Sequence, residues 1–221
     1  MPDAEPQSTA SIPNPVHDWE ISVETIKALE SKWLIPDIVN QLLVWENRLA
    51  LLQVLGEIPE WSFEFFWMPS SPFSQHYPAT FVIDWITFNC SEQYMMYRKA
   101  IFFGDTTIAD EILKESNPKK QKDLWKQVQW FDENKWKAIC REIVYKWNYE
   151  KFTQNPNLLE ALFKTTWKIL VEASPYDNIW WIWLKESDER SKNPLEWLWT
   201  NWLGIILTVL RENLKQKILT T

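Results

Sequence analysis

The chain has 221 residues, of which 46% are hydrophobic, and it carries a formal net charge of −7. This length and apolar content predict one globular domain with an appendage. The acidic balance argues against a general nucleic-acid-binding protein, because phosphate neutralisation requires a basic surface. A local basic patch is nevertheless present at Lys119, Lys120, Lys122 and Lys126. The only cysteines and histidines, two of each, lack the spacing of a zinc site.

The first 57 residues are expected to lie outside the main domain. Residues 1–17 are polar and proline-rich, which is typical of a disordered lead-in rather than a signal peptide. Residues 18–57 carry apolar side chains at the spacing of two helices, which either dock on the main domain or bind a partner. The longest uncharged apolar stretch, 197–210, has 14 residues and is too short to span a bilayer. We therefore expect a cytoplasmic protein with no membrane partner.

Residues 58–216 are predicted to form a helix-rich α+β domain with a small antiparallel sheet. A strand at 62–67 precedes a loop at 69–78 and a hairpin of 80–84 with 86–89. Helices are expected at 90–103, 107–116, 118–126, 132–149 and 156–164. A strand at 168–172, a loop at 174–184, a charged connector at 185–192 and a helix at 195–215 complete the domain.

The chain contains 17 tryptophans but only 3 glycines, where roughly 15 glycines are usual for this length. Several tryptophans occupy positions that favour glycine, such as Trp85, which with Gly would give the Asp-Gly signal of a hairpin turn. Trp147 is expected to end one helix just before another begins. We hypothesise that the gene comes from a source that reads the codon UGA as glycine, and that the sequence was translated as if UGA encoded tryptophan. The alternative is a protein that is truly rich in tryptophan. The suspected positions are Trp19, Trp33, Trp61, Trp85, Trp125, Trp130, Trp147, Trp167, Trp181, Trp183 and Trp199.

Two side chains near the start of the 90–103 helix could carry chemistry. Glu92 either belongs to a capping box with Asn89 or lines a cleft as a carboxylate. Lys99 lies on roughly the same helix face and is either solvated or positioned to meet a phosphate.

A second group of candidates follows the 168–172 strand. Asp177, in Ser-Pro-Tyr-Asp-Asn, is either a structural turn residue or part of a polar pocket rim. Glu172 belongs to the same rim, or it alternates out of the sheet to solvent or pairs with a lysine.

Aromatic and amide groups suggest recognition of a flat ring or a sugar. Trp136 either packs as a hydrophobic staple with Phe131 or offers a surface on which a heterocycle stacks. The loop at 72–78, with Ser74 and Gln75, suits recognition of a sugar or base edge, and it equally suits a packed surface loop.

Taken in order, these segments resemble the NADAR or YbiA-like family over about residues 62–213. The matching segments are F-F-W (65–67), F-S-Q-H-Y-P (73–78), N-C-S-E-Q-Y-M-M (89–96), F-G-D (103–105), F-D-E-N-K-W (131–136), K-F-T-Q-N-P (151–156), L-V-E-A-S-P-Y-D-N-I-W (170–180) and N-W-L-G (201–204). The family pattern has Gly at Trp85, Trp125, Trp130, Trp147, Trp181, Trp183 and Trp199, which agrees with the codon hypothesis.

The resemblance implies a hydrolase of N-glycosidic bonds without a metal or redox cofactor. One branch of the family resembles an enzyme that splits riboflavin-pathway intermediates, and another resembles hydrolases that remove ADP-ribose from guanine in nucleic acid. The alternatives are therefore a phosphoribosyl N-glycosidase, an ADP-ribosyl-guanine hydrolase that counters a toxin, and a non-catalytic NAD or ADP-ribose-binding module.

The family's functional Glu, Trp and Asp match Glu92, Trp136 and Asp177. We expect Glu92 and Asp177 to be the catalytic carboxylates, because cleavage at an anomeric carbon develops positive charge. The expected substrate-binding residues are Trp136, Lys99, Ser74, Gln75, Glu172 and Trp180.

Overall fold

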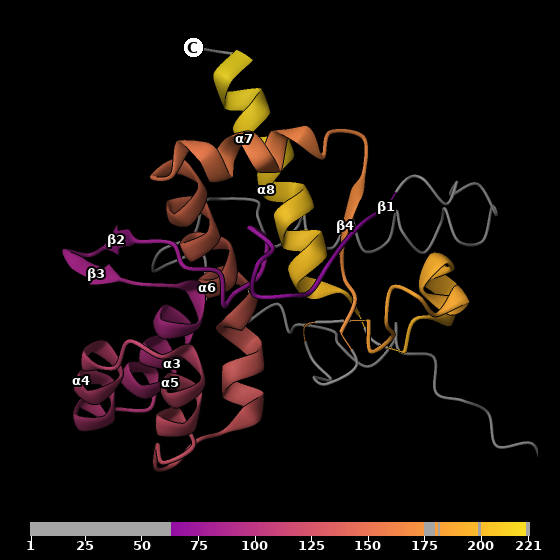
Figure 1. Ribbon diagram of the computed structural model, residues 1–221. Helices are drawn as coiled ribbons and strands as arrows, with labels where there is room; N and C mark the ends of the chain where they lie inside the picture. The colour runs from indigo at the N-terminus through magenta and orange to yellow at the C-terminus, as the bar shows by residue number, and fades with distance from the viewer. Residues whose placement is uncertain (1–62, 175–179, 181, 199, 220–221) are drawn as a thin grey trace, which may run out of the picture.

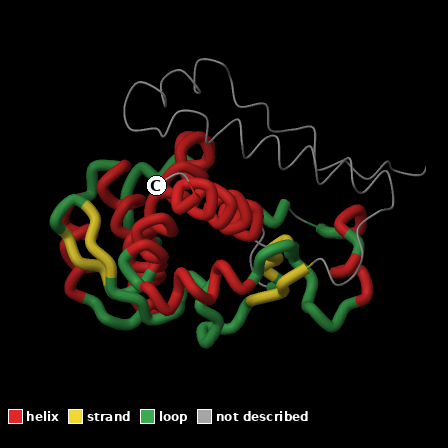
Figure 2. The backbone as a smooth tube through the Cα atoms, turned by 90° about the horizontal axis from the view of Figure 1, so that it is seen from above, coloured by secondary structure: helices red, strands yellow, loops and turns green. Residues whose placement is uncertain are grey.

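The computed structural model describes residues 63–174, 180, 182–198 and 200–219 (Figure 1). The expected lead-in and helical appendage, residues 1–57, lie outside the described residues. A body of helices separates two small sheets, which lie on opposite sides of it (Figures 1 and 2). The expected α+β, helix-rich fold is confirmed.

The described elements follow the expected order. They are β1 (Phe63–Phe66), β2 (Phe81–Ile83), β3 (Ile86–Phe88), α3 (Ser91–Phe102), α4 (Thr106–Lys114), α5 (Pro118–Trp125), α6 (Glu133–Thr153), α7 (Pro156–Lys164), β4 (Ile169–Glu172), the 3₁₀ helices η2 (Glu189–Lys192) and η3 (Pro194–Glu196), and α8 (Trp202–Leu219). In the part of the chain that the structure describes, no helix is long and apolar enough to cross a bilayer.

Strands β2 and β3 form the expected antiparallel hairpin, whereas β1 and β4 pair in parallel. Phe63 lies opposite Ile169 and Phe66 opposite Glu172, so two segments that are distant in the chain meet in one ribbon. The sequence pattern did not predict this parallel pair, because its strands are distant in the chain and their partner cannot be inferred from local spacing.

The hairpin turn places two consecutive residues in the left-handed region, Asp84 at φ 51° and Trp85 at φ 67°. Positive φ at both central residues is the pattern of a type I′ turn, which favours Asn-Gly or Asp-Gly. Trp85 is 98% exposed, so its indole gains no packing in return. Trp130, Trp167 and Trp183 also have positive φ, which bulky side chains rarely adopt.

The outer edge of the hairpin is covered by the end of α6. The Gln154 side chain accepts a hydrogen bond from the Val82 backbone N–H at 2.8 Å and donates one to the Val82 carbonyl at 2.9 Å. Asn155 donates to the Thr80 carbonyl at 3.0 Å. These side chains fix the hairpin to the long central helix.

Two helix boundaries differ from expectation. Helix α6 runs to Thr153, so Trp147 does not end a helix; it is fully buried in the interior of α6, where it contacts Tyr94 at a ring-centroid distance of 5.7 Å. Helix α8 begins at Trp202 rather than near residue 195. Asn201, at φ 52°, precedes it and uses its side chain to bond β4 instead of continuing the helix backwards.

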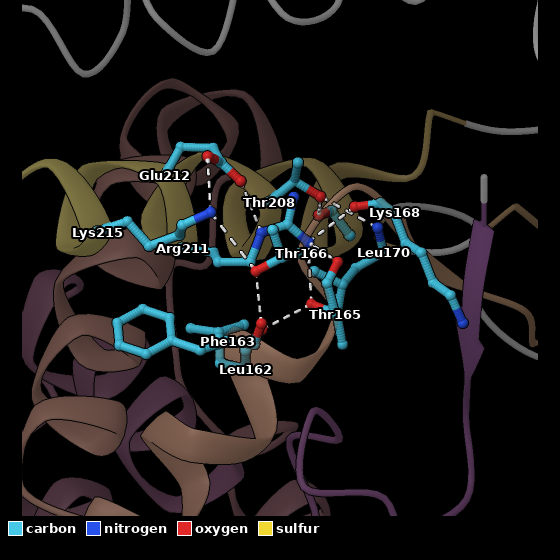
Figure 3. Close-up of polar contacts among 11 residues, drawn as sticks. Leu162, Phe163, Thr165, Thr166, Lys168, Leu170, Thr208, Arg211, Glu212 and Lys215 are labelled. Carbon is cyan, nitrogen blue, oxygen red and sulfur yellow. Dashed lines mark hydrogen bonds and ion pairs between the residues drawn. The ribbon is translucent and has the colours of Figure 1, made fainter.

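Helix α8 packs closely on β4. A Cβ at Gly204 would lie 2.1 Å from the carbonyl oxygen of Leu170, so only glycine allows this approach. The Thr208 hydroxyl accepts from the Leu170 N–H at 3.1 Å. The buried Arg211 donates to the carbonyls of Thr165 and Lys168 (Figure 3). These contacts hold β4 at a fixed place against the helical body.

Candidate active site

A fully buried lysine holds the loop between β1 and β2. Lys151, on α6, donates hydrogen bonds to the carbonyls of Pro72 at 2.8 Å and Ser74 at 3.0 Å. Burial lowers the pKa of Lys151 to about 7, and the opposing electrostatic effect of Cys90 and Glu172 is smaller. The loop therefore rests on an internal support rather than lying loosely on the surface.

Glu92 is not the capping residue that the sequence allowed. The N-cap of α3 is Cys90, whose Sγ accepts from the Gln93 N–H at 3.5 Å, and the Gln93 side chain accepts from the Asn89 N–H at 2.8 Å. The Glu92 carboxylate is left free of the cap and is buried, with 4% of the residue exposed. Its Oε2 lies 3.9 Å from His76 Nε2.

Glu172, the last residue of β4, points into the domain rather than to solvent, with 3% of its surface exposed. Its backbone N–H donates to Asn201 Oδ1 at 3.0 Å, and Asn201 in turn donates to the Leu170 carbonyl at 3.0 Å. Of the alternatives for Glu172, exposure to solvent is therefore excluded. Pairing of β4 with β1 and α8 leaves its side chain facing the interior.

Aromatic rings surround the ammonium group of Lys99. Its Nζ lies 4.0 Å from the ring centroid of Trp125, 5.4 Å from that of Trp136 and 6.0 Å from that of Phe131. Lys99 is only 8% exposed, so a solvated lysine is excluded. Cation–π contacts of this kind stabilise a charge that has lost water.

These side chains line one cavity of about 510 Å³, a size typical of small-molecule sites. The sequence-predicted residues in its lining are Ser74, Gln75, Glu92, Lys99, Trp136, Glu172 and Trp180. The cavity thus combines buried carboxylates, an amide, a lysine and indoles from five separate segments. The expected catalytic Asp177 lies outside the described residues.

The lining also contains residues that the sequence analysis did not assign to the site, among them His76, Lys122 and Trp125. His76 follows Gln75 in the same loop, and this adjacency in the sequence could have indicated that His76 also lines the site. Lys122 belongs to the basic patch. Which lysine of this patch faces the cavity could not be inferred from the sequence, because it depends on how α5 packs. Within the described ranges, no group of three or more His, Cys, Asp or Glu side chains is arranged to hold a metal ion.

Chemically, the cavity offers carboxylates removed from water next to flat apolar surfaces. Such carboxylates stabilise positive charge that develops on a bound group more strongly than exposed ones do. The indoles of Trp125 and Trp136 provide faces for a planar ring, and Lys99 and Lys122 provide positive charge. This set suits a ligand that has a polar, an aromatic and an anionic part.

Comparison with known proteins identifies the family. The model of the NADAR domain matches residues 65–215, more than half of the chain. Protein irg-1 of Caenorhabditis elegans is 43% identical over 131 residues, which cover 58% of this chain and 62% of that protein, less than two thirds of its length. N-glycosidase R617 of Acanthamoeba polyphaga mimivirus is 36% identical over 149 residues, which cover 65% of this chain and 88% of that protein.

A solved structure shows the same fold. The NMR structure of the Escherichia coli protein YbiA matches with a TM-score of 0.60 and 23% sequence identity, and the match covers 76% of this chain and 94% of that one. The family match, the relatives and the shared fold agree, and the chain belongs to the NADAR domain family.

Proposed function

We propose that this chain is an N-glycosidase that hydrolyses the bond between ribose and a nitrogenous base. The observation that carries this proposal is the burial of Glu92 and Glu172 in one aromatic-walled cavity. The similarity to the N-glycosidase R617 supports the same chemical class.

In the proposed reaction, the C–N bond at the anomeric carbon breaks and positive charge develops on the sugar. A carboxylate next to that carbon stabilises the charge and another group activates water. We assign the catalytic pair to Glu92 and Asp177, as the family resemblance implies, and place Glu172 as a substrate-binding carboxylate. Trp136 would stack on the departing base.

The substrate is proposed to carry phosphate. Lys99 and Lys122 line the cavity, and a lysine ammonium binds phosphate as a point charge. A phosphoribosyl compound such as an early riboflavin-pathway intermediate fits this arrangement. The protein is proposed to act in the cytoplasm, which agrees with its two free, buried cysteines.

A second candidate substrate is ADP-ribosylated guanine in nucleic acid. It is favoured by the position of Lys122, which joins the cavity to exposed Lys119 and Lys120 on the same helix. These lysines could contact nucleic-acid phosphates next to the cavity, whatever the overall charge. Chromatographic assay with a riboflavin-pathway intermediate and with ADP-ribosylated DNA separates the two substrates.

Substitution of the carboxylates tests the catalytic assignment. Glu92→Gln and Asp177→Asn should each lower hydrolysis at least about a hundredfold if the groups act as acid or base. Glu111→Gln, on the exposed face of α4, serves as the control and should keep full activity. Near-normal turnover by Glu92→Gln would remove Glu92 from the mechanism, and absence of turnover in the unsubstituted protein on both substrates would favour a non-catalytic binding module.

We also propose that a subset of the tryptophans replaces natural glycines through reading of UGA as tryptophan. Positive φ at Trp85, Trp130, Trp167 and Trp183 supports this proposal. The test is to read the codons and to determine by mass spectrometry the residue at these positions in protein from the natural source. UGG codons there would overturn the proposal. The answer matters for the site, since Trp125, another suspected position, lines the cavity.

A further inference from the structure

A buried amide oxygen that has no hydrogen-bond partner among the described residues belongs to Gln75, in the wall of the cavity. Gln75 is only 7% exposed, and its Oε1 accepts no hydrogen bond from any described residue. Buried polar groups are normally satisfied, because losing water without a replacement is costly. An exception at a cavity wall indicates a group that a ligand satisfies.

The backbone that carries this amide is held in place by two hydrogen bonds. Lys151 holds the carbonyl of Ser74, the residue before Gln75, and the Gln75 carbonyl accepts a hydrogen bond from the Glu92 N–H at 3.0 Å. The second bond joins Gln75 directly to the backbone of Glu92. The backbone of Gln75 is therefore fixed next to that of Glu92, and both residues line the same cavity.

Glu92 has the same unmet capacity. Its Oε1 is buried and has no hydrogen-bond partner within the part of the chain that the structure describes. Gln75 Oε1 and Glu92 Oε1 are thus two unsatisfied acceptors on residues that line one cavity, and a ligand with two hydroxyl donors would satisfy both. Since an amide offers N–H as well as oxygen, Gln75 can also bond a hydroxyl oxygen.

The vicinal hydroxyls of ribose are one pair of donors of this kind. If Glu92 lies next to the anomeric carbon, the hydroxyl on the neighbouring carbon comes within reach of Gln75. The base would stack separately on the indoles of Trp125 and Trp136. We propose that Gln75 recognises the 2-hydroxyl of the sugar and makes the site selective for ribosyl over 2-deoxyribosyl groups. This inference rests on the proposed function for the identity of the ligand.

Binding of the sugar product tests the inference without requiring turnover. D-ribose 5-phosphate and 2-deoxy-D-ribose 5-phosphate are titrated by calorimetry into the unsubstituted protein, Gln75→Met and the control Gln127→Met. Gln127 is exposed on the segment after α5 and does not line the cavity. The unsubstituted protein and the control should prefer the ribose form at least about tenfold, the value of one good hydrogen bond. Gln75→Met should reduce this preference below about threefold.

Thermal melting checks that Gln75→Met is folded. Because Met removes a buried group that lacks a partner, we expect the melting temperature to be unchanged or to rise by roughly 2 to 4 °C. Gln75→Ala is a second variant that removes the amide without requiring a larger apolar side chain to fit. It should lose the sugar preference in the same way.

The outcomes are distinct. Equal binding of both sugars by the unsubstituted protein, binding of neither sugar, or a preference that persists in both Gln75 variants would each overturn the inference. If the ribose preference is present and depends on Gln75, yet no N-ribosyl compound is cleaved, then the hydrolase proposal fails while the sugar site stands.

Discussion

Replacement of the buried Lys151 by Met should change how the stability of the protein depends on pH. Lys151 is fully buried and its pKa is lowered by burial from 10.5 to about 7. In the unfolded chain the same group regains water and its ordinary pKa. The folded and unfolded states therefore bind different numbers of protons at this residue over a defined pH range.

The sign follows from proton counting. Between pH 7 and 10.5 the unfolded state holds the Lys151 proton and the folded state has lost it, so stability rises with pH by about 1.4 kcal/mol per unit. Below pH 7 both states are protonated, and above pH 10.5 both are neutral, so the dependence ends. The full span of the effect is about 5 kcal/mol.

Other groups limit the range that can be used. Burial raises the pKa of Cys90 to about 11 and that of Cys140 to about 12, from 9.0 in each case. Above pH 9 their unfolded forms lose protons that the folded forms keep, so these thiols make stability fall as pH rises. The clean range is pH 7 to 8.5, over which Lys151 should contribute about 2 kcal/mol.

The measurement is urea denaturation at half-unit steps from pH 7 to 8.5, with a reducing agent present, for the unsubstituted protein and Lys151→Met. The difference in unfolding free energy between them should grow with pH in favour of the unsubstituted protein by about 2 kcal/mol. The control is Lys146→Met, which changes a half-buried lysine on the same helix and leaves Lys151 in place. Its unfolding free energy should depend on pH with the same slope as that of the unsubstituted protein. If the unfolding free energies of the unsubstituted protein and Lys151→Met change with pH in parallel, the lowered pKa of Lys151 is refuted.

Three further predictions concern the turn, the α8 contact and the base-stacking surface. Trp85→Gly should raise the unfolding free energy by about 1–2 kcal/mol, by removing left-handed strain, whereas Trp85→Ala should gain less; urea denaturation that ranks Ala equal to Gly would contradict this. Gly204→Ala should lower the unfolding free energy by about 1–3 kcal/mol, because its Cβ meets the Leu170 carbonyl, and an unchanged melting curve would disprove the close contact. Trp136→Phe should raise KM about threefold to tenfold with a smaller effect on kcat, and steady-state kinetics with an unaltered KM would argue against stacking.

Most helices could be predicted from local signals alone. The helices expected from residues 118, 132 and 156 begin within one residue of those positions, where Asp132 caps α6 and Pro118 and Pro156 lie in the first turns of α5 and α7. The end of α6 was expected at residue 149 rather than at Thr153, because Trp147 was taken to lie at a helix terminus, although a large apolar residue also suits a helix interior. The start of α8 was missed because residues 195–201 are apolar enough to extend its pattern. Tertiary bonds from Asn201 to β4 decided that boundary.

The candidate site could be predicted in its members but not in its geometry. Glu92 illustrates the difference: a carboxylate near a helix start suggests capping, and only the cap made by Cys90 and Gln93 shows that it does something else. The inward direction of Glu172 depends on the parallel partner of β4, which has no local signal. Lys151 was part of a quoted motif, yet its support of the loop became visible only when α6 was placed beneath residues 72–74.

The side-chain amide of Gln154 has a consequence for solubility. An uncovered strand edge is a template on which a second chain can add as another strand, and this is a common route to aggregation. Gln154 occupies both the donor and the acceptor of Val82, so it imitates the peptide group that an incoming strand would present. A second chain that added at this edge would first have to displace the two hydrogen bonds between Gln154 and Val82. A single side chain thereby protects the short hairpin from self-association.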